Sequence, residues 1–448
     1  MADTFWIKPE KIFWFVVTFR RQLLRMSKFT CIDSIVSHGL CAGCGLCASL
    51  SGEKSVQMSI SAGGQMRPQV KRQLSRATMN RIRAVCPGIR ITGPDRKSVG
   101  SQGTMHPIWG PVRTINRGWS LDPEIRFQSA AGGTLTALGI YLLNTNAVDA
   151  ILHVRASTDN PLLTDAQISR TAGEVRSGAA SRYGPASPLL HVHRLLDEGV
   201  RFAVIAKPCD IAGIRNLQRI DDRADKQIPY CLTMFCGGVP TVTTAREIIA
   251  YHGVDESAVE EFRFRGNGWP GPLRVRTSTG KVFDHDYTET WSESRYPWKY
   301  DMQFRCKICP DAIGEQADVT CPDGWLMEDD KPVHKEAPGI SIVIARTARG
   351  QRLVEDAAAA DCIKLEPCDL SEMKDMHYDH LPRKFEYPAR SLAMKLSGCP
   401  APKVRNFRFW WTVLHAGLTT NVKAFWETRK RVIAGYNREA IDDSGPSN

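Results

Sequence analysis

The chain has 448 residues, of which 42% are hydrophobic and 24% are charged, and its formal net charge is +11. This length predicts two or three domains with a substantial core, and the composition excludes a disordered chain. No apolar run approaches the roughly 20 residues that cross a bilayer, and the first residues lack the pattern of an export signal. We therefore expect a cytoplasmic protein without a transmembrane segment.

Two terminal segments carry nearly all of the excess positive charge. Residues 1–28 contain six basic and two acidic residues, and residues 401–431 contain seven and one. Nucleic-acid-binding proteins spread their basic residues over a groove or domain, so no nucleic-acid partner is expected. The two segments are predicted to be amphipathic helices. They either pack on the body of the protein or dock on an acidic protein or an anionic membrane.

The first cluster of cysteines along the chain is the triplet Cys41, Cys44 and Cys47. The glycines between these cysteines let a short loop curl around a cube of iron and sulfide and bring N–H groups near its sulfurs. A fourth thiolate is needed, and Cys86, which is followed by proline, is the predicted one. Zinc is the alternative, although a closed zinc site normally has two paired ligands on each side. We predict an iron–sulfur module over residues 29–100.

A glycine-containing loop, Ser129 to Thr134, comes next. Gly132 and Gly133 let backbone N–H groups approach an anion, and the N-terminus of the following helix adds a favourable dipole. The loop therefore suits the pyrophosphate of a dinucleotide, with an ordinary helix start as the alternative. No Gly-x-Gly-x-x-Gly or Walker pattern occurs in the sequence, which disfavours a standard nicotinamide site.

From Phe127 onward, apolar strands alternate with helices, which is typical of an α/β sheet. The predicted elements are a helix over 135–144, strands over 150–154, 202–206 and 339–345, and a helix that begins near residue 350. We expect an α+β or α/β chain with a ferredoxin-like iron–sulfur module and helical terminal extensions. The predicted parts are a basic aromatic extension over 1–28, the module over 29–100, a mixed α/β domain over 101–375, and a C-terminal linker and basic, Trp-rich tail over 376–448.

Four further cysteines lie in predicted loops. Cys209 follows the strand over 202–206, Cys236 follows another apolar run, and Cys306 and Cys309 form a Cys-x-x-Cys pair. Strand ends of an α/β sheet line the crevice where cofactors bind, so these four thiolates can form a second cage. The pair alone also fits half a zinc site or a redox dithiol. Cys231 is predicted to be a core thiol, although it stays open as the alternative ligand to Cys236.

The ordered motifs resemble the coenzyme F420 hydrogenase/dehydrogenase beta-subunit family, which includes 7-hydroxymethyl chlorophyll a reductase and ferredoxin-dependent 8-vinyl reductases. The resemblance covers roughly residues 38–370, and the joint order of the motifs makes it specific. The matching motifs are the Cys41–Cys47 triplet, Ser129-Ala-Ala-Gly-Gly133, Ser181-Arg-Tyr183-Gly-Pro185, Lys207-Pro-Cys209-Asp210, Cys236-Gly237, Arg265-Gly-Asn-Gly-Trp-Pro-Gly271, Arg305-Cys-Lys-Ile-Cys309-Pro-Asp311 and Ala317-Asp318. The sequence departs from the family at Cys321-Pro322, before Asp323, which leaves the role of that loop open.

The resemblance implies FAD and two [4Fe–4S] clusters, and thus a flavin-binding role for the domain over 101–375. The flavin-binding residues that it implies are Ser129, Gly132, Gly133, Thr134, Ser181, Tyr183 and Lys207. The second-cluster ligands that it implies are Cys209, Cys236, Cys306 and Cys309.

A flavin converts between the single electrons of iron–sulfur clusters and the two electrons that an organic ring takes up. We therefore expect an oxidoreductase that passes electrons from ferredoxin or another acidic carrier, through the clusters and FAD, to a tetrapyrrole or deazaflavin ring. Lys207 is expected to stabilise negative charge on the reduced flavin, and Asp210 or Asp318 to supply a proton, with loop capping as their alternative role. Homo- and hetero-oligomers both stay open.

Two other functions compete with this expectation. The chain can be the electron-transfer beta subunit of a coenzyme F420 hydrogenase or dehydrogenase complex, or a non-catalytic iron–sulfur protein that has lost its flavin. The flavin content of the anaerobically purified protein separates the non-catalytic protein from the other two.

Overall fold

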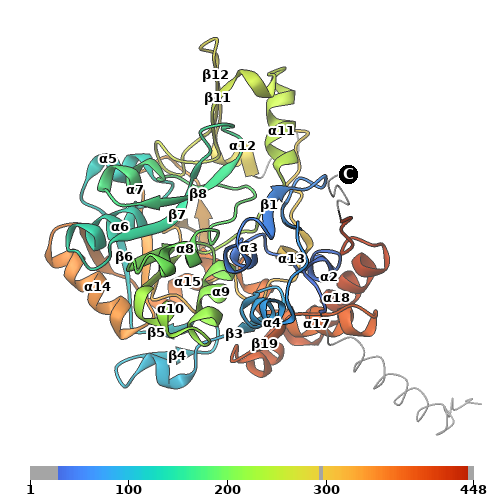
Figure 1. Ribbon diagram of the computed structural model, residues 1–448. Coiled ribbons are helices and arrows are strands. Elements are labelled where there is room, and N and C mark those ends of the chain that lie inside the picture. Colours follow the sequence, from blue (N-terminus) through green and yellow to red (C-terminus); the bar gives the residue numbers. More distant parts are fainter. Residues whose placement is uncertain (1–28, 292–295, 442–448) are drawn as a thin grey trace, which may run out of the picture.

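The computed structural model describes residues 29–291 and 296–441, so the predicted extension over residues 1–28 lies outside the described part. Its centre is an eight-stranded mixed sheet in the order β18-β6-β17-β14-β10-β9-β7-β8 (Figure 1). In chain order, these strands are β6 (Thr114–Ser120), β7 (Ala150–Ala156), β8 (Thr164–Ser169), β9 (Phe202–Ile205), β10 (Tyr230–Thr233), β14 (Val319–Thr320), β17 (Ser341–Ala345) and β18 (Ile363–Pro367).

Strands β7, β9, β10 and β14 are mutually parallel, whereas β8, β17, β6 and β18 pair with their neighbours in antiparallel fashion. Successive side chains of a strand point to opposite faces, and here both faces are apolar. Ala203 and Leu232 pack in the core on one face, while Val204 and Cys231 pack in the core on the other. The parallel strands are therefore buried on both sides, and their carboxyl ends meet at one edge.

Helices cover both faces of the sheet (Figure 1). Helix α6 (Thr134–Asn144) and helix α14 (Ala348–Ala359) share one core through Leu138 and Val354. On the other face lie α8 (Val192–Asp197), α9 (Pro208–Gln218) and α10 (Asp222–Gln227), with Leu195, Ile211 and Ala224 in their shared core. The loops after β9 and β10 begin at the edge of the sheet where the carboxyl ends of the parallel strands meet.

The cysteine triplet lies in a smaller layer beside the sheet. This layer comprises α2 (Ile32–Val36), α3 (Leu46–Ser51), the hairpin of β1 (Val56–Ile60) and β2 (Met66–Val70), and α4 (Arg76–Val85). Ser75 caps α4 because its hydroxyl accepts a hydrogen bond from the Thr78 N–H group. Met394 and Val432, far away in sequence, complete the core of this layer.

The C-terminal helices close the molecule around that layer. They are α15 (Met373–Met376), α16 (Leu381–Phe385), α17 (Tyr387–Leu396) and α18 (Phe409–Ile433), with a break in α18 at Gly417. Between α17 and α18, β19 (Lys403–Arg405) pairs in parallel with β3 (Arg90–Thr92). Beyond α18, Glu439 forms a bidentate ion pair with the buried Arg67 of β2, at 2.5 and 2.8 Å.

The remaining elements form hairpins and short helices at the edges. A three-stranded sheet of β11 (Val259–Arg263), β12 (Leu273–Thr277) and β13 (Val282–His285) packs with α11 (Val242–Tyr251). The others are β4 (Thr104–His106), β5 (Gly110–Val112), α5 (Pro123–Gln128), α7 (Ala172–Ser177), α12 (Tyr287–Trp291), α13 (Phe304–Lys307), β15 (Leu326–Glu328) and β16 (Lys331–Val333). In the part of the chain that the structure describes, no helix is both long and apolar enough to span a bilayer.

The structure confirms the mixed α/β class and the alternation expected from Phe127 onward. The predicted helix over 135–144 is α6, and the predicted strands over 150–154, 202–206 and 339–345 are β7, β9 and β17. The expected helical C-terminal extension is α18. The ferredoxin-like character of the N-terminal module and the four domain bounds stay predictions.

Candidate functional site

The first set of thiols, Cys41, Cys44, Cys47 and Cys86, comes together at the start of α3 and the end of α4. Their charges interact: Cys44 and Cys47 with each other, and each of these with Cys86. Cys41 interacts with Cys47 and Cys86. Burial raises the pKa of all four thiols, that of Cys86 to about 12, so thiolates at these positions need a positive partner.

The glycines in this loop have conformational reasons to be glycine. Gly43 and Gly45 have φ angles of 72° and 83°, in the left-handed region. A Cβ atom at Gly43 would lie 2.9 Å from the Met66 carbonyl oxygen. The Gly43 N–H group donates a hydrogen bond to Cys41 Sγ at 3.4 Å. The loop therefore places a backbone N–H group beside a sulfur atom of the first thiol set.

The second set, Cys209, Cys236, Cys306 and Cys309, is assembled from three loops. Cys209 begins α9 after β9, Cys236 follows β10, and the other two flank the end of α13. The Cys209 thiol interacts with those of Cys236 and Cys309, and Cys236 interacts with Cys306 and Cys309. Cys306 Sγ accepts hydrogen bonds from the Val239 N–H group and from Gln303 Nε2, both at 3.4 Å.

Cys231 lies apart from this second set. It is fully buried in the core beneath the sheet, and its charge interactions are with Arg215, Asp318 and Arg349. Cys231 lies within β10 with its side chain in the core, whereas Cys236 lies in the loop after β10. The structure thus groups Cys236, and not Cys231, with Cys209, Cys306 and Cys309.

Two charged residues lie between the two thiol sets. The carboxyl group of Asp210 interacts with both Cys44 and Cys209, which places the start of α9 beside both sets. Arg305 interacts with Cys86 of the first set and Cys309 of the second. Its Nη2 donates to the Pro87 carbonyl oxygen at 3.3 Å, and its side chain is buried. The two sets are therefore neighbours.

Lys207 and Asp210 form an ion pair at the edge of the second set. Lys207 Nζ lies 2.7 Å from Asp210 Oδ2, and the Lys207 N–H group donates to the same oxygen at 3.2 Å. Burial raises the pKa of Asp210, and the Lys207 ammonium group opposes that rise. Lys207 lines the cavity described next, whereas Asp210 is fully buried behind it.

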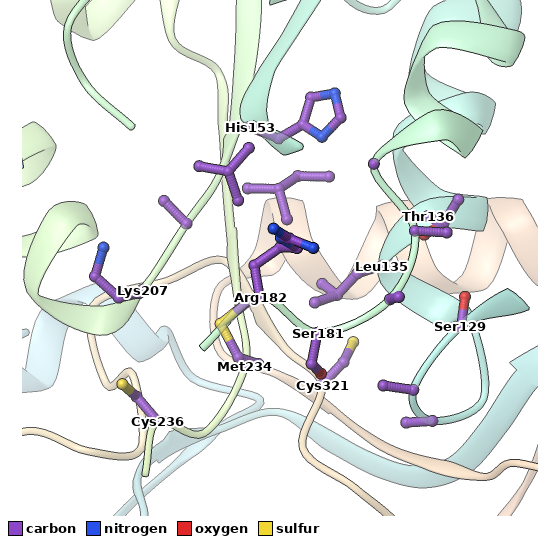
Figure 2. Close-up of a pocket in the computed structure, with 18 of the residues that line it drawn as sticks. Ser129, Leu135, Thr136, His153, Ser181, Arg182, Lys207, Met234, Cys236 and Cys321 are labelled. Carbon is purple, nitrogen blue, oxygen red and sulfur yellow. The ribbon is translucent and has the colours of Figure 1, made fainter. Parts of the chain in front are cut away.

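A large cleft opens against the second thiol set, with an empty volume of about 1370 Å³ including its mouth. Figure 2 shows Lys207 and Cys236 on one side and Ser129 and Thr136 on the other, with Arg182 between them. Of the predicted flavin-binding residues, those that line the cleft are Ser129, Gly133, Thr134, Ser181, Tyr183 and Lys207. Gly132 is not among the lining residues.

The loop before α6 is held close to the sheet. The Gly132 N–H group donates to Ser341 Oγ at 3.1 Å, and a Cβ atom at Gly132 would lie 2.5 Å from the Gly118 carbonyl oxygen. Ser129 Oγ is buried without a hydrogen-bond partner among the described residues. A buried hydroxyl without a partner loses the water that it would otherwise bind, so this oxygen is a candidate ligand contact.

An ion pair that the sequence did not reveal closes another wall of the cleft. Arg265 pairs with Asp323 through two hydrogen bonds, at 2.8 and 3.1 Å, and its Nη1 lies 3.4 Å from the Tyr183 hydroxyl. The guanidinium group also lies over the rings of Tyr287 and Trp325. The sequence motif that begins at Arg265 does not indicate this partner, because Asp323 lies 58 residues further along the chain.

The structure places Asp318 away from the cleft, so the expectation that it supplies a proton there finds no geometric support. Its carboxylate accepts hydrogen bonds from Arg215 at 2.9 Å, from the Cys231 N–H group at 2.8 Å and from Thr347 at 2.7 Å. Asp318 therefore joins α9, β10 and the cap of α14. His153 and Arg182 line the cleft instead. Arg182 lies inside the motif Ser181-Arg-Tyr183-Gly-Pro185 but was not among the predicted site residues, and no motif pointed to His153.

Comparisons with known proteins match most of this region. The C-terminal part of the coenzyme F420 hydrogenase/dehydrogenase beta subunit matches residues 199–371, and its N-terminal part matches residues 115–194. The coenzyme F420-dependent sulfite reductase of Methanocaldococcus jannaschii is 22% identical over an alignment of 429 residues that covers 92% of this chain. The chain spans only 59% of that relative's length.

Two further relatives extend the comparison. The coenzyme F420 hydrogenase subunit beta of Methanothermobacter thermautotrophicus is 25% identical over 58% of this chain and 87% of its own length. A chain of the solved F420-reducing [NiFe] hydrogenase complex from Methanosarcina barkeri shares the fold, with a TM-score of 0.52 and 17% identity, over 67% of this chain and 98% of its own. Since the two matched parts together cover more than half of the sequence, this chain belongs to the coenzyme F420 hydrogenase/dehydrogenase beta-subunit family.

Proposed function

We propose that this chain is an electron-transfer oxidoreductase that carries two [4Fe–4S] clusters and FAD and exchanges electrons with a deazaflavin of the coenzyme F420 type, as a subunit of a larger complex. The observation that carries the proposal is the pair of neighbouring four-thiol sets, the second of which opens into a large cleft. Three relatives are named for coenzyme F420 or dependence on it, which favours the deazaflavin over the tetrapyrrole and ferredoxin expected first.

The spacing of the thiols supports clusters over single zinc ions. A tetrahedral zinc site with Zn–S bonds of about 2.3 Å holds its sulfurs about 3.8 Å apart. Among the described residues, no three cysteines bring their sulfur atoms within 4.8 Å of one another. A cube of iron and sulfide is larger than one ion and accommodates the wider spacing.

The cleft supports a flavin nucleotide as the second cofactor. Ser129 offers a buried hydroxyl without a partner, and Gly133 and Thr134 open helix α6 at the cleft wall. A helix N-terminus of this kind favours a phosphate group. A flavin bound there would supply the conversion between single electrons and electron pairs.

Within this proposal, the chain's own residues orient and polarise the bound groups. Lys207 places a positive charge between the second thiol set and the cleft, held in place by Asp210. Arg265, held by Asp323, donates a hydrogen bond to the Tyr183 hydroxyl oxygen, and so this ion pair shapes the opposite wall. Asp210 is buried behind Lys207, which makes its positioning role better supported than proton donation to a substrate.

The test is the cofactor content of protein purified without oxygen. We expect about eight iron atoms, about eight sulfides and one flavin per chain. Reduced coenzyme F420, added as the probe, should bleach the flavin and cluster absorbance. Zinc in place of iron, or a colourless protein, contradicts the proposal. Clusters without flavin would favour the non-catalytic alternative. Reduction by ferredoxin but not by the deazaflavin would instead favour the ferredoxin-dependent oxidoreductase expected from the sequence.

A further inference from the structure

Helix α18 exposes large apolar side chains that the rest of the described chain does not cover. They have exposed fractions between 46% and 80% and are Trp410, Leu414, Leu418, Val422, Trp426 and Ile433. Single exposed apolar residues are normal on a protein surface, but a contiguous row of them marks an interaction site. We call these six residues the α18 stripe.

The residues of the α18 stripe recur at helical spacing. In the segment after the break at Gly417, one residue turns the helix by about 100°, so Leu418, Val422, Trp426 and Ile433 fall within an arc of about 80°. Before the break, Trp410 and Leu414 are four residues apart and share a face. Within each of the two helical segments, the residues of the α18 stripe therefore lie on one face.

In the segment of α18 after Gly417, the fully buried side chains are smaller than those of the stripe, which departs from the usual pattern of a surface helix. Ala424, Thr428 and Val432 are buried, and Val432 belongs to the core around Ile32 and Met394. After Gly417 the helix thus packs on the body mainly through these three residues, with Phe425 half-buried, whereas at its start Phe409 stacks on Tyr387 and Phe407. This arrangement stabilises the fold less than the reverse one would, so a partner for the outward face is the physical reason for it.

Basic residues lie within and beside the α18 stripe. Lys423 and Lys430 are exposed on its flank, and Arg429 lies over the Trp426 ring at 5.9 Å. Residues 401–431 contain seven basic residues and one glutamate, Glu427. A second copy of the chain would bring the same positive surface against this one, and like charges in contact repel each other. The occupant should therefore be apolar at its centre and negatively charged around it.

We propose that α18 docks this chain onto an anionic lipid surface, lying in the plane of the headgroups. An apolar stripe with tryptophans near its ends and lysines on its flank is the pattern of an interfacial helix. The described helices include none that could span a bilayer, so the contact is peripheral. Figure 1 shows α18 on the opposite side of the molecule from α5, α6 and α7. Residues of α6 and α7 line the cleft. Docking through α18 would leave the cleft open to its substrate.

The experiment measures binding of the full-length protein to vesicles of phosphatidylcholine alone and to vesicles that also contain phosphatidylglycerol. We expect binding to the anionic vesicles only. The double substitution Leu418→Ser with Trp426→Ser should weaken that binding by about tenfold or more, because both side chains leave the apolar phase. Lys423→Gln with Lys430→Gln should weaken it by about fivefold per lysine.

The matched control places the same chemistry elsewhere. Ile220→Ser with Val282→Ser removes two similarly exposed aliphatic residues outside α18 and should leave vesicle binding unchanged. Circular dichroism and iron content should match the parent protein in all variants, which separates a docking defect from a folding defect or a failed cofactor assignment.

Three outcomes would overturn the proposal. The first is that the parent protein does not bind anionic vesicles. The second is that the α18 variants bind as well as the parent, which would assign the contact to another part of the chain. The third is that light scattering shows a dimer, or a complex with an acidic protein, that the Leu418→Ser and Trp426→Ser substitutions dissociate, while vesicles are not bound.

Discussion

Asp210 and Arg305 lie where the two thiol sets approach each other, one with a negative and one with a positive charge. Asp210 has Lys207 as its ion-pair partner. Arg305 forms no ion pair with a carboxylate among the described residues, and its Nε is buried without a hydrogen-bond partner. A buried cation needs negative charge nearby. In the proposed holoprotein, thiolate-ligated clusters on both sides of Arg305 would supply it.

Replacing single cysteines tests the second thiol set directly. We expect Cys236→Ala to remove one cluster, so that the iron content per chain falls by about half. Cys231→Ala is the matched control: its thiol is buried but lies apart from the set, and the iron content should not change. Iron analysis and electron paramagnetic resonance of reduced protein measure both. If Cys231→Ala lost the iron instead, the grouping of thiols described above would be wrong.

His153 predicts a pH dependence of stability. Burial lowers its pKa from 6.5 to about 4 in the folded protein. The unfolded chain therefore binds a proton below pH 6.5 that the folded chain takes up only near pH 4, so stability is present above 6.5 and is lost as the pH falls. Between pH 7 and pH 5 the loss should be about 2 kcal/mol.

The matched variant for this pH dependence is His153→Gln, which can keep the hydrogen bond to Ser169 Oγ, found at 2.7 Å. Denaturant unfolding at the two pH values should show a loss smaller by about 2 kcal/mol than in the parent protein. Equal losses in the two proteins would show that His153 does not titrate as its burial implies.

At the scale of the element, the loop between α5 and α6 packs tightly against the sheet at the cleft wall. We expect Gly132→Ala to destabilise the protein by on the order of 2 kcal/mol, because the new Cβ meets backbone atoms that cannot move away. Its flavin content should fall as well.

Gly173→Ala is the control for this loop. Gly173 lies in helix α7, and a Cβ atom there would meet nothing within 4 Å. Alanine should therefore leave stability unchanged or raise it by up to about 1 kcal/mol. Thermal unfolding and bound flavin measure both variants. A Gly132→Ala protein with the stability and flavin of the parent would contradict the tight packing of this loop.

The strands and helices of the central sheet could be predicted from the sequence because each is a continuous run whose pattern is local. The predicted runs over 150–154 and 202–206 correspond to β7 and β9, with nearly the same bounds. The cleft walls were less predictable because they are made by contacts between distant residues. Arg265 and Asp323 pair across 58 residues, and no local pattern records such a partner. The partners of Asp318 could not be predicted for the same reason, since its three hydrogen-bond donors come from other elements.

At the scale of the whole molecule, the end of the described chain is tied to the first thiol set. Glu439 pairs with the buried Arg67, and Arg67 lies close enough to Cys41 to lower the pKa of that thiol against the effect of burial. We expect Glu439→Gln to lower the free energy of unfolding by about 3 kcal/mol, because it leaves Arg67 buried without its carboxylate. The first cluster should also lose iron to a chelator faster.

Glu427→Gln is the control for that change. Glu427 makes only exposed ion pairs with Lys423 and Arg431 on α18, so its loss should cost less than about 1 kcal/mol. Chemical denaturation and the rate of iron release compare the two variants. Similar effects of both substitutions would mean that the tie between the chain end and β2 contributes little.

The distribution of the thiols along the chain bears on how the protein matures during synthesis. The four cysteines of the first thiol set leave the ribosome before any strand of the central sheet, so iron can reach them early. The second thiol set is complete only once Cys309 has been synthesised, which is after β9 and β10, the strands that pair beside it. We expect a nascent chain halted between these points to hold a single cofactor, with the later one installed only into a nearly finished fold.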